Sequence, residues 1–166
     1  VIHHEKNMGY GVTLRDGFLA GKYDYVMYTD GDNQYDVNEF EPHIHLLKTH
    51  DILSGYAPIK VVTFRRKFQS WAYNTIIKLL FFVSIKDIDC AMKIYSRRFL
   101  DKITIQSTSA FIDAEMLIKA KRGKFKIAQF AVTQYPRLSG PEGGVRKDVI
   151  LGTIKEKIKF RLGLLK

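Results

Sequence analysis

Segments that favour β-strands alternate along this chain with longer segments of helical pattern. β-Branched and aromatic residues fill YDYVMYT, DILSGY, CAMKIYS and FKIAQFAVTQY, each over about the length of one strand. Helices are predicted over residues 12–20, 38–50, 66–82 and 112–122, with Asn38 as the cap of the second. This alternation predicts an α/β domain with a largely parallel sheet and flanking helices. The opening residues VIH are interpreted as the end of a further strand.

An acidic loop, TDGDNQYD, follows directly after YDYVMYT. In open α/β sheets, ligands bind at the carboxyl ends of the strands, where this loop is expected to lie. Asp30 and Asp32, two residues apart, can direct hard oxygen ligands at one Mg²⁺ or Mn²⁺ that keeps open positions for phosphate oxygens. Such an ion stabilises a diphosphate leaving group, and this chemistry suits transfer of a sugar from a nucleotide diphosphate sugar.

Two other interpretations of the loop stay open on the residues alone. The first is a helix-loop-helix calcium site, since its ligand positions would be filled by Asp30, Asp32, Gln34, Asp36 and Glu41. Against it, Tyr35 replaces the glycine that the sharp turn needs, and a strand precedes the loop where a helix is required. The second is a polar turn whose carboxylates are merely solvated.

Charge and composition narrow the class of partner. With 27 basic against 17 acidic residues, the chain carries a net charge of +10, which favours phosphates, nucleic acid or an acidic membrane face. No helix-turn-helix or aromatic β-platform motif accompanies this charge, so nucleic acid is not the expected partner. The single Cys90 excludes an intramolecular disulfide and a cysteine-rich zinc site. Residues 147–165 predict a basic amphipathic helix that could rest on anionic lipid.

Histidines and aromatic residues are assigned mainly structural roles. The five histidines show no zinc-like spacing. Trp71 and most tyrosines and phenylalanines are expected in the core. The apolar stretch over residues 76–85 is too short to span a bilayer.

Several separated motifs together resemble family 2 glycosyltransferases of the dolichyl- or polyprenyl-phosphate sugar transferase branch. They are HHEKNMGYGVTLRDGF, YDYVMYTDGDNQYD, DILSGY, RRKFQSWAYN, KDIDCAMKIYSRR, IDAEMLIKAKRGKFKIAQFAV and YPRLSG, in that order. The resemblance implies a Rossmann-like glycosyltransferase type-A fold. It also implies that the chain lacks two strand–helix units that begin such proteins, the first with a P.YNE segment. Residues 1–145 would then be a partial catalytic domain, and residues 146–166 the basic amphipathic helix.

The resemblance also implies roles on the donor side of the site. The metal ligands are matched by Asp30, Asp32 and Gln34, and the donor-binding positions by Asn7, Gly9, Gly11, Asp30 and Arg137. Arg137 would contact the donor diphosphate from a glycine-containing loop. From the residues alone, an ordinary helix start stays open as the alternative for the Asn7–Gly11 turn.

On the acceptor side, Arg66 and Ser70 match the residues that receive the acceptor phosphate, with Arg65 as a neighbouring candidate. A guanidinium fork binds phosphate bidentately, and a hydroxyl four residues on adds a donor. Asp89 matches an aspartate near the reacting centre, and Asp87 lies two residues before it. Asp89 would serve as general base for a hydroxyl acceptor, whereas a phosphate acceptor needs none.

Two further acidic residues match the family pattern, and the sequence departs from that pattern at two places. Asp113 and Glu115 match the family's acidic helix start, although acids there also complement the helix dipole. Ala57 stands where an arginine commonly contacts the acceptor, and Lys60 would be only a partial replacement. After Gly140, PEGGVRK replaces an expected serine–lysine pair.

The predicted function combines these roles. Asp32, Arg66 and Asp89 would be central to an inverting hexosyltransferase that uses Mg²⁺ or Mn²⁺. The donor would be a nucleotide diphosphate sugar of the GDP-mannose or UDP-glucose type, and the acceptor a polyprenyl phosphate. The chain would act in the cytoplasm, peripherally at the cytoplasmic face of an anionic membrane. The alternative is a catalytically inactive truncated fragment that binds phosphates or anionic membrane.

Overall fold

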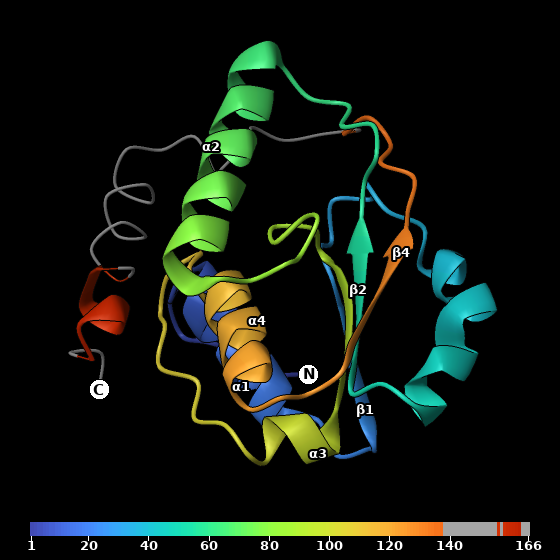
Figure 1. Ribbon diagram of the computed structural model, residues 1–166. Helices are drawn as coiled ribbons and strands as arrows, with labels where there is room; N and C mark the ends of the chain where they lie inside the picture. The colour runs from blue at the N-terminus through green and yellow to red at the C-terminus, as the bar shows by residue number, and fades with distance from the viewer. Residues whose placement is uncertain (138–155, 157, 164–166) are drawn as a thin grey trace.

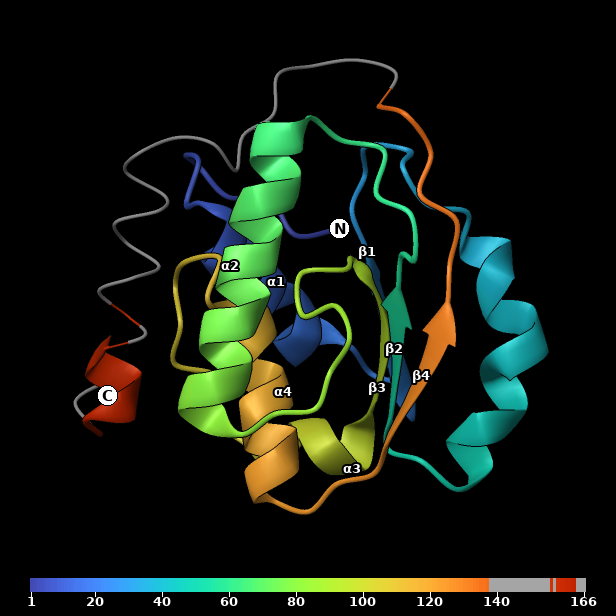
Figure 2. The same ribbon diagram turned by 45° about the horizontal axis from the view of Figure 1, so that its top comes forward.

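The computed structural model describes residues 1–137, 156 and 158–163 as one mixed sheet with helices on both faces (Figure 1). The strands are β1 (Tyr25–Thr29), β2 (Ile52–Tyr56), β3 (Met92–Ser96) and β4 (Ile127–Ala131), in the spatial order β1-β3-β2-β4. The helices are α1 (Tyr10–Ala20), the 3₁₀ helix η1 (Val37–Lys48), α2 (Phe64–Phe81), α3 (Arg97–Leu100) and α4 (Ile112–Arg122). In both views α1, α2 and α4 cover one face of the sheet and η1 covers the other (Figure 2).

The strand directions correct part of the sequence-based prediction. β1, β2 and β4 run the same way, as expected, but β3 lies between β1 and β2 and runs against both. The pairings of β3 are therefore antiparallel, and β2 with β4 is parallel. The pattern of CAMKIYS did not reveal this direction because every residue of β3 is buried, as in a parallel strand.

The core has two main layers that follow the alternation of side chains along the strands. Ile52 and Tyr95 face α1 and α4, where they pack with Met116. Leu53 and Phe130 face η1, where they pack with Phe40. A third cluster fills the space between α2 and α4.

Most predicted elements are confirmed, with differences at their ends. Residues 1–9 form no strand, and α3 was not predicted. Asp36, not Asn38, caps η1, because the Asp36 carboxylate accepts the Asn38 backbone N–H at 2.9 Å. The predicted helix over residues 147–165 lies mostly outside the described residues. Of its described residues, Phe160 is buried against Phe81 and Phe111.

One side of α2 is exposed and apolar, which makes the placement of Trp71 in the core wrong. Trp71 is 63% exposed, and it belongs to a stripe that we call the α2 apolar face: Phe64, Phe68, Trp71, Leu79 and Phe82. The helix carries apolar residues on two sides, and only the side with Ile77 and Phe81 packs against α4. Among the described residues, no helix is long and apolar enough to cross a membrane.

Candidate active site

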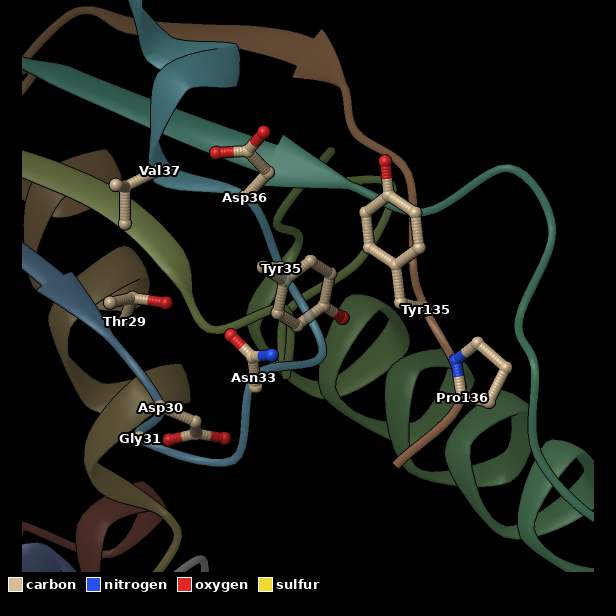
Figure 3. A pocket seen from close by; sticks show the side chains of 9 residues that line it. All are labelled: Thr29, Asp30, Gly31, Asn33, Tyr35, Asp36, Val37, Tyr135 and Pro136. Atoms are coloured by element: carbon tan, nitrogen blue, oxygen red, sulfur yellow. The ribbon is translucent and has the colours of Figure 1, made fainter. Parts of the chain in front are cut away.

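The acidic loop begins where β1 ends and crosses to the segment that follows β4. The Tyr135 N–H donates to the Gln34 carbonyl at 2.8 Å, and the Gln34 side-chain amide donates to the Tyr135 carbonyl at 3.2 Å. Between these segments lies an open cavity of about 620 Å³ whose lining includes Asp30, Asn33, Tyr35, Tyr135 and Pro136 (Figure 3). The loop therefore lies at the carboxyl ends of the strands, where α/β folds bind ligands.

Three of the predicted donor-side residues are brought together at Asp32. Its Oδ1 accepts the Gln34 backbone N–H at 3.2 Å, and its Oδ2 accepts from Arg137 Nη2 at 3.0 Å. The ion pair with Arg137 joins residues 105 positions apart, so the guanidinium lies at the acidic loop; its contact with a donor diphosphate remains a prediction. Asp32 itself does not line the cavity, although its neighbours do.

Asp30 lies in a more negative and more buried environment. Burial, then the nearby Asp113 and Asp32 carboxylates, raise the pKa of Asp30 above its usual range, against a hydrogen bond from Tyr28 and the charge of Lys93. A bound cation would relieve this repulsion. A calcium loop of the helix-loop-helix kind is excluded, because a strand precedes the loop and Asp36 is used as a helix cap.

Behind Asp30 lies a buried ion pair that sequence reasoning missed. Lys93 of β3 is fully buried, and its Nζ donates to Asp113 at 2.7 Å and to the Cys90 carbonyl at 2.6 Å. The sequence feature that could have indicated this pair is a lysine within the mainly apolar strand segment CAMKIYS. Asp113 was predicted as an acid at the start of a helix, and its carboxylate forms an ion pair with Lys93. Its second oxygen accepts a hydrogen bond from the Tyr10 hydroxyl at 2.8 Å.

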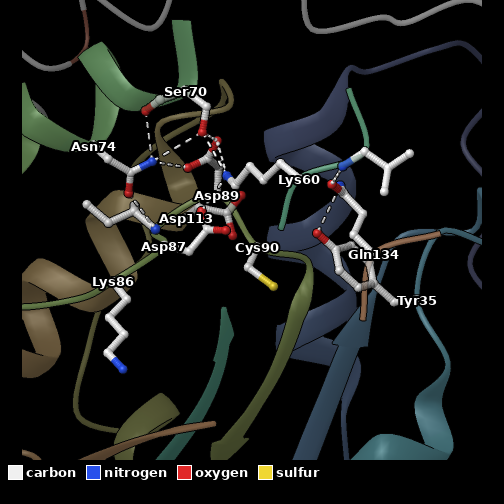
Figure 4. Close-up of polar contacts among 12 residues, drawn as sticks. Tyr35, Lys60, Ser70, Asn74, Lys86, Asp87, Asp89, Cys90, Asp113 and Gln134 are labelled. Atoms are coloured by element: carbon white, nitrogen blue, oxygen red, sulfur yellow. Dashed lines mark hydrogen bonds and ion pairs between the residues drawn. The ribbon is translucent and has the colours of Figure 1, made fainter. Parts of the chain in front are cut away.

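The predicted acceptor residues Ser70 and Asp89 also meet (Figure 4). The Ser70 hydroxyl donates to Asp89 Oδ2 at 2.9 Å, and Asn74 donates to Asp89 Oδ1 at 2.5 Å. Lys60 joins them, since its Nζ donates to Ser70 Oγ at 2.7 Å and to Asp87 at 2.8 Å. Ser70 and Asn74 lie four residues apart on α2 and so share a face of the helix, but this spacing gives no sign of the link to Lys60.

The two carboxylates of this cluster have opposite environments. Burial and the neighbouring Asp89 raise the pKa of Asp87, and one Asp87 oxygen has no hydrogen-bond partner among the described residues. Burial also disfavours the charged form of Asp89, but Lys60 and the hydrogen bonds from Ser70 and Asn74 outweigh it and lower the Asp89 pKa. These contacts therefore favour the ionised form of Asp89, and the lowered pKa makes it a weak base.

Arg66 and Arg65 remain open to solvent at the start of α2. Arg66 is partly exposed, and its guanidinium makes no ion pair or hydrogen bond within the described part of the chain. It lies one helical turn from Ser70, as predicted, and so could contact an anion there. Arg65 is exposed, and Ser70 does not lie one helical turn from it as it does from Arg66.

The glycine-containing turn has clear structural reasons for its residues. Asn7 Oδ1 accepts the Gly9 N–H at 2.9 Å, and Gly9 has a φ of 84°, which favours glycine. A Cβ on Gly11 would lie 2.4 Å from the Thr108 carbonyl carbon, so this glycine lets α1 approach the loop before α4. A direct contact of the turn with a donor remains a prediction.

Glu115 and Ala57 have mainly structural surroundings. The Glu115 carboxylate accepts the backbone N–H groups of Gln106 and Ser107 at 2.9 and 2.7 Å and pairs with Lys119 at 2.6 Å, so it closes the loop before α4. Ala57 is buried just after β2.

The cavity beside Asp30 and the ion pair of Asp32 with Arg137 mark a candidate ligand site, and comparison with known proteins identifies the family. Residues 1–104 match the model described as glycosyl transferase family 2, and the chain belongs to this family. Glycosyltransferase AglD from Haloferax volcanii is 28% identical over 143 residues, which cover 81% of this chain and 23% of that protein.

Two solved structures share the fold. Glucosyl-3-phosphoglycerate synthase from Mycobacterium tuberculosis, in complex with uridine diphosphate, matches 95% of this chain and 55% of its own, with a TM-score of 0.66 and 16% identity. A structure described as a mycobacterial protein matches 100% of this chain and 54% of its own, with a TM-score of 0.59 and 17% identity. The glycosyltransferase type-A fold is thereby confirmed. The chain spans 23% of the curated relative and about half of each structure.

Proposed function

We propose that this chain forms the catalytic part of a metal-dependent, inverting glycosyltransferase. The donor would be a nucleotide diphosphate sugar of the GDP-mannose or UDP-glucose type, and the acceptor a polyprenyl phosphate. The proposal rests above all on the acidic loop at the end of β1, where Asp30 borders a cavity of about 620 Å³ and Asp32 pairs with Arg137.

The chemistry of the loop fits a hard divalent cation. Asp30 and Asp32 offer carboxylate oxygens, and the Gln34 amide oxygen accepts no hydrogen bond from a described residue. No three His, Cys, Asp or Glu side chains converge on one point in the described residues, so phosphate oxygens and water would complete the coordination of Mg²⁺ or Mn²⁺. When bound, such an ion stabilises the negative charge of the departing nucleoside diphosphate.

The side chains around the loop would orient the donor and balance its charge. Arg137 lies 3.0 Å from Asp32, so a diphosphate held at the loop would be within reach of its guanidinium fork. The excess of carboxylates over cations near Asp30 favours a cation there over a bare phosphate. Asp30 and Asp32 would thus bind the metal, and Arg137 the diphosphate.

On the acceptor side, Arg66 would bind the phosphate, and Ser70 would donate to it by exchanging its hydrogen bond to Asp89 for one to a phosphate oxygen. Arg66 is a cation with no ion-pair partner among the described residues and lies one helical turn from Ser70, while Lys60 is paired with Asp87. A phosphate acceptor is already an oxyanion, so no general base is required for its attack. Asp89, ionised and fixed by Ser70 and Asn74, would orient the Ser70 hydroxyl.

The α2 apolar face supports action at a membrane surface. Phe68 and Trp71 are 59% and 63% exposed, and Arg65 and Lys67 lie at the same end of the helix. Exposed aromatic residues beside basic ones suit the boundary between anionic headgroups and acyl chains. We therefore place the protein peripherally at the cytoplasmic face of a membrane, where a polyprenyl phosphate would be presented next to Arg66.

Transfer of labelled sugar to polyprenyl phosphate in anionic vesicles tests the activity. With Mn²⁺ present, the wild type should form product, and Asp32→Asn should reduce the rate about a hundredfold or more. Asp24→Asn, an exposed carboxylate away from the loop, is the matched control. Equal rates for Asp32→Asn and the wild type would refute the metal role. Nucleotide binding without any transfer would favour the inactive phosphate-binding alternative.

Vesicle sedimentation tests the membrane contact separately. Replacing Phe68 and Trp71 by glutamate should weaken binding to vesicles containing phosphatidylserine by tenfold or more, since each buried aromatic side chain contributes about 1.5–3 kcal/mol. Tyr23→Glu, an exposed aromatic residue before β1, should bind like the wild type. Unchanged binding of the Phe68 and Trp71 variant would remove α2 from the proposed interface.

A further inference from the structure

A continuous chain of polar contacts runs from the core of the domain to the Asp30 carboxylate. The buried Lys93–Asp113 pair, at 2.7 Å, is its inner end. Tyr10 donates its proton to the second Asp113 oxygen at 2.8 Å, and its hydroxyl oxygen lies in close contact with the hydroxyl of Tyr28. The Tyr28 hydroxyl then donates to Asp30 Oδ1 at 3.2 Å. These side chains come from β3, α4, α1 and β1, so the chain of contacts joins elements distant in sequence.

The inner part of this chain has little freedom to move. Lys93 is 0% exposed, Asp113 6% and Tyr28 5%. The Lys93 ammonium also donates to the Cys90 carbonyl at 2.6 Å and lies 5.5 Å from the centre of the Tyr28 ring. A charge buried this deeply must keep its partner, because an unpaired one would cost several kcal/mol. The position of the Asp113 carboxylate is therefore fixed by the core.

We propose that Tyr28 and Tyr10 are positioning residues for the Asp30 carboxylate, with the Lys93–Asp113 pair as their fixed anchor. By holding one oxygen of Asp30, the Tyr28 hydroxyl sets the rotation of the carboxylate and leaves its other oxygen for a cation. Residues that donate hydrogen bonds to metal-ligating carboxylates commonly orient them in this way. The inference rests on the proposed metal role of Asp30.

The same contacts link the glycine-containing turn to the metal-binding loop. Tyr10 stands between Gly9 and Gly11 at the first position of α1, and Gly11 allows α1 to approach the Thr108 backbone before α4. Tyr10 therefore reaches Asp113 and Tyr28 only because α1 lies this close to α4. The turn thus has a role in placing Asp30, in addition to any contact that it makes with a donor.

Phenylalanine variants separate positioning from simple packing, because they remove one hydroxyl and keep the ring. Mn²⁺ affinity is measured by electron paramagnetic resonance or calorimetry on the full chain, with uridine diphosphate present. Tyr28→Phe should weaken Mn²⁺ binding about 10- to 100-fold. Tyr10→Phe should weaken it less, since Asp30 keeps its contact with Tyr28. Tyr25→Phe is the control, because this hydroxyl on the same strand donates only to the Leu47 carbonyl, at 3.4 Å.

The outcomes distinguish this inference from the proposed function. If the wild type binds Mn²⁺ and both the Tyr28→Phe and Tyr10→Phe variants bind it equally well, the positioning role is wrong and the metal site stands. If the wild type binds no Mn²⁺, the proposed metal role fails and the inference fails with it. A loss in Tyr28→Phe must occur with an unchanged melting temperature. If Tyr28→Phe is destabilised, the Mn²⁺ affinities of Tyr10→Phe and Tyr25→Phe are compared instead. A weaker affinity in Tyr10→Phe would support the inference, and equal affinities would overturn it.

Discussion

Replacing Lys93 by methionine should strongly destabilise the protein. The side chain is fully buried, and its ammonium makes two short hydrogen bonds, to Asp113 at 2.7 Å and to the Cys90 carbonyl at 2.6 Å. Methionine fills nearly the same volume, so the main effect is electrostatic. Asp113 would remain buried with only the Tyr10 hydroxyl as a donor, and the Cys90 carbonyl would lose a hydrogen bond.

The size of the effect follows from the loss of one partner of a buried ion pair. Such a loss costs about 3–5 kcal/mol, a large part of the 5–15 kcal/mol that a typical domain has in total. For a domain of this size, each kcal/mol lowers the melting temperature by about 2–4 °C, so we expect a decrease of roughly 6–20 °C. Pairing the change with Asp113→Asn removes the unpaired charge and should recover more than half of the loss.

Urea denaturation followed by circular dichroism measures these free energies of unfolding. Lys102→Met is the matched control, because this lysine is exposed, and it should leave the midpoint unchanged. A cost below about 1 kcal/mol for Lys93→Met would refute the reasoning, since a paired buried charge cannot be lost so cheaply. A double variant less stable than Lys93→Met alone would equally show that the two side chains are not coupled as described.

Two further predictions concern local packing and pH. Gly11→Ala should destabilise the protein by about 1–3 kcal/mol in the same urea assay, because its Cβ would meet the Thr108 backbone at 2.4 Å. Gly17→Ala, on the same helix with open space around it, should stabilise by up to about 1 kcal/mol, and equal effects of the two would contradict the packing described. Burial opposes ionisation of Glu156, but hydrogen bonds from the serine and threonine side chains of residues 107–109 outweigh it and lower its pKa. A lowered carboxyl pKa gives stability that is present above the unfolded-state pKa and is lost as pH falls through the folded-state pKa. The stability difference between the wild type and Glu156→Gln should therefore shrink as the pH falls below the ordinary glutamate pKa of about 4.3, and a difference independent of pH would contradict this role.

The local features of the fold were predictable, because they depend on neighbouring residues. Hydrophobic spacing located α1, α2 and α4 to within two residues at each end, and the strand before the acidic loop placed Asp30 at a strand end. Arg66 and Ser70 lie one helical turn apart on α2, as their spacing of four residues predicted. Cys90 is buried, and this burial raises its pKa to about 11.

Features that depend on long-range packing were not predictable from the residues alone. Nothing in CAMKIYS indicates that β3 runs against its neighbours, or that Lys93 has a buried partner 20 residues later. Trp71 was misplaced because an apolar residue on a helix gives no sign of which side meets the core. The contact of Arg137 with Asp32 spans 105 residues, and no local pattern in the sequence indicates it.

Binding of a nucleoside diphosphate in the presence and absence of Mn²⁺ tests the central claim most directly. Calorimetric titration of the full chain with uridine and guanosine diphosphates should show binding of at least one in Mn²⁺. That binding should disappear when EDTA removes the ion, and also in the Asp30→Asn and Asp32→Asn double variant at an unchanged melting temperature. Equal nucleotide affinity with and without the ion, or in the double variant and the wild type, would contradict a divalent cation held by these two carboxylates.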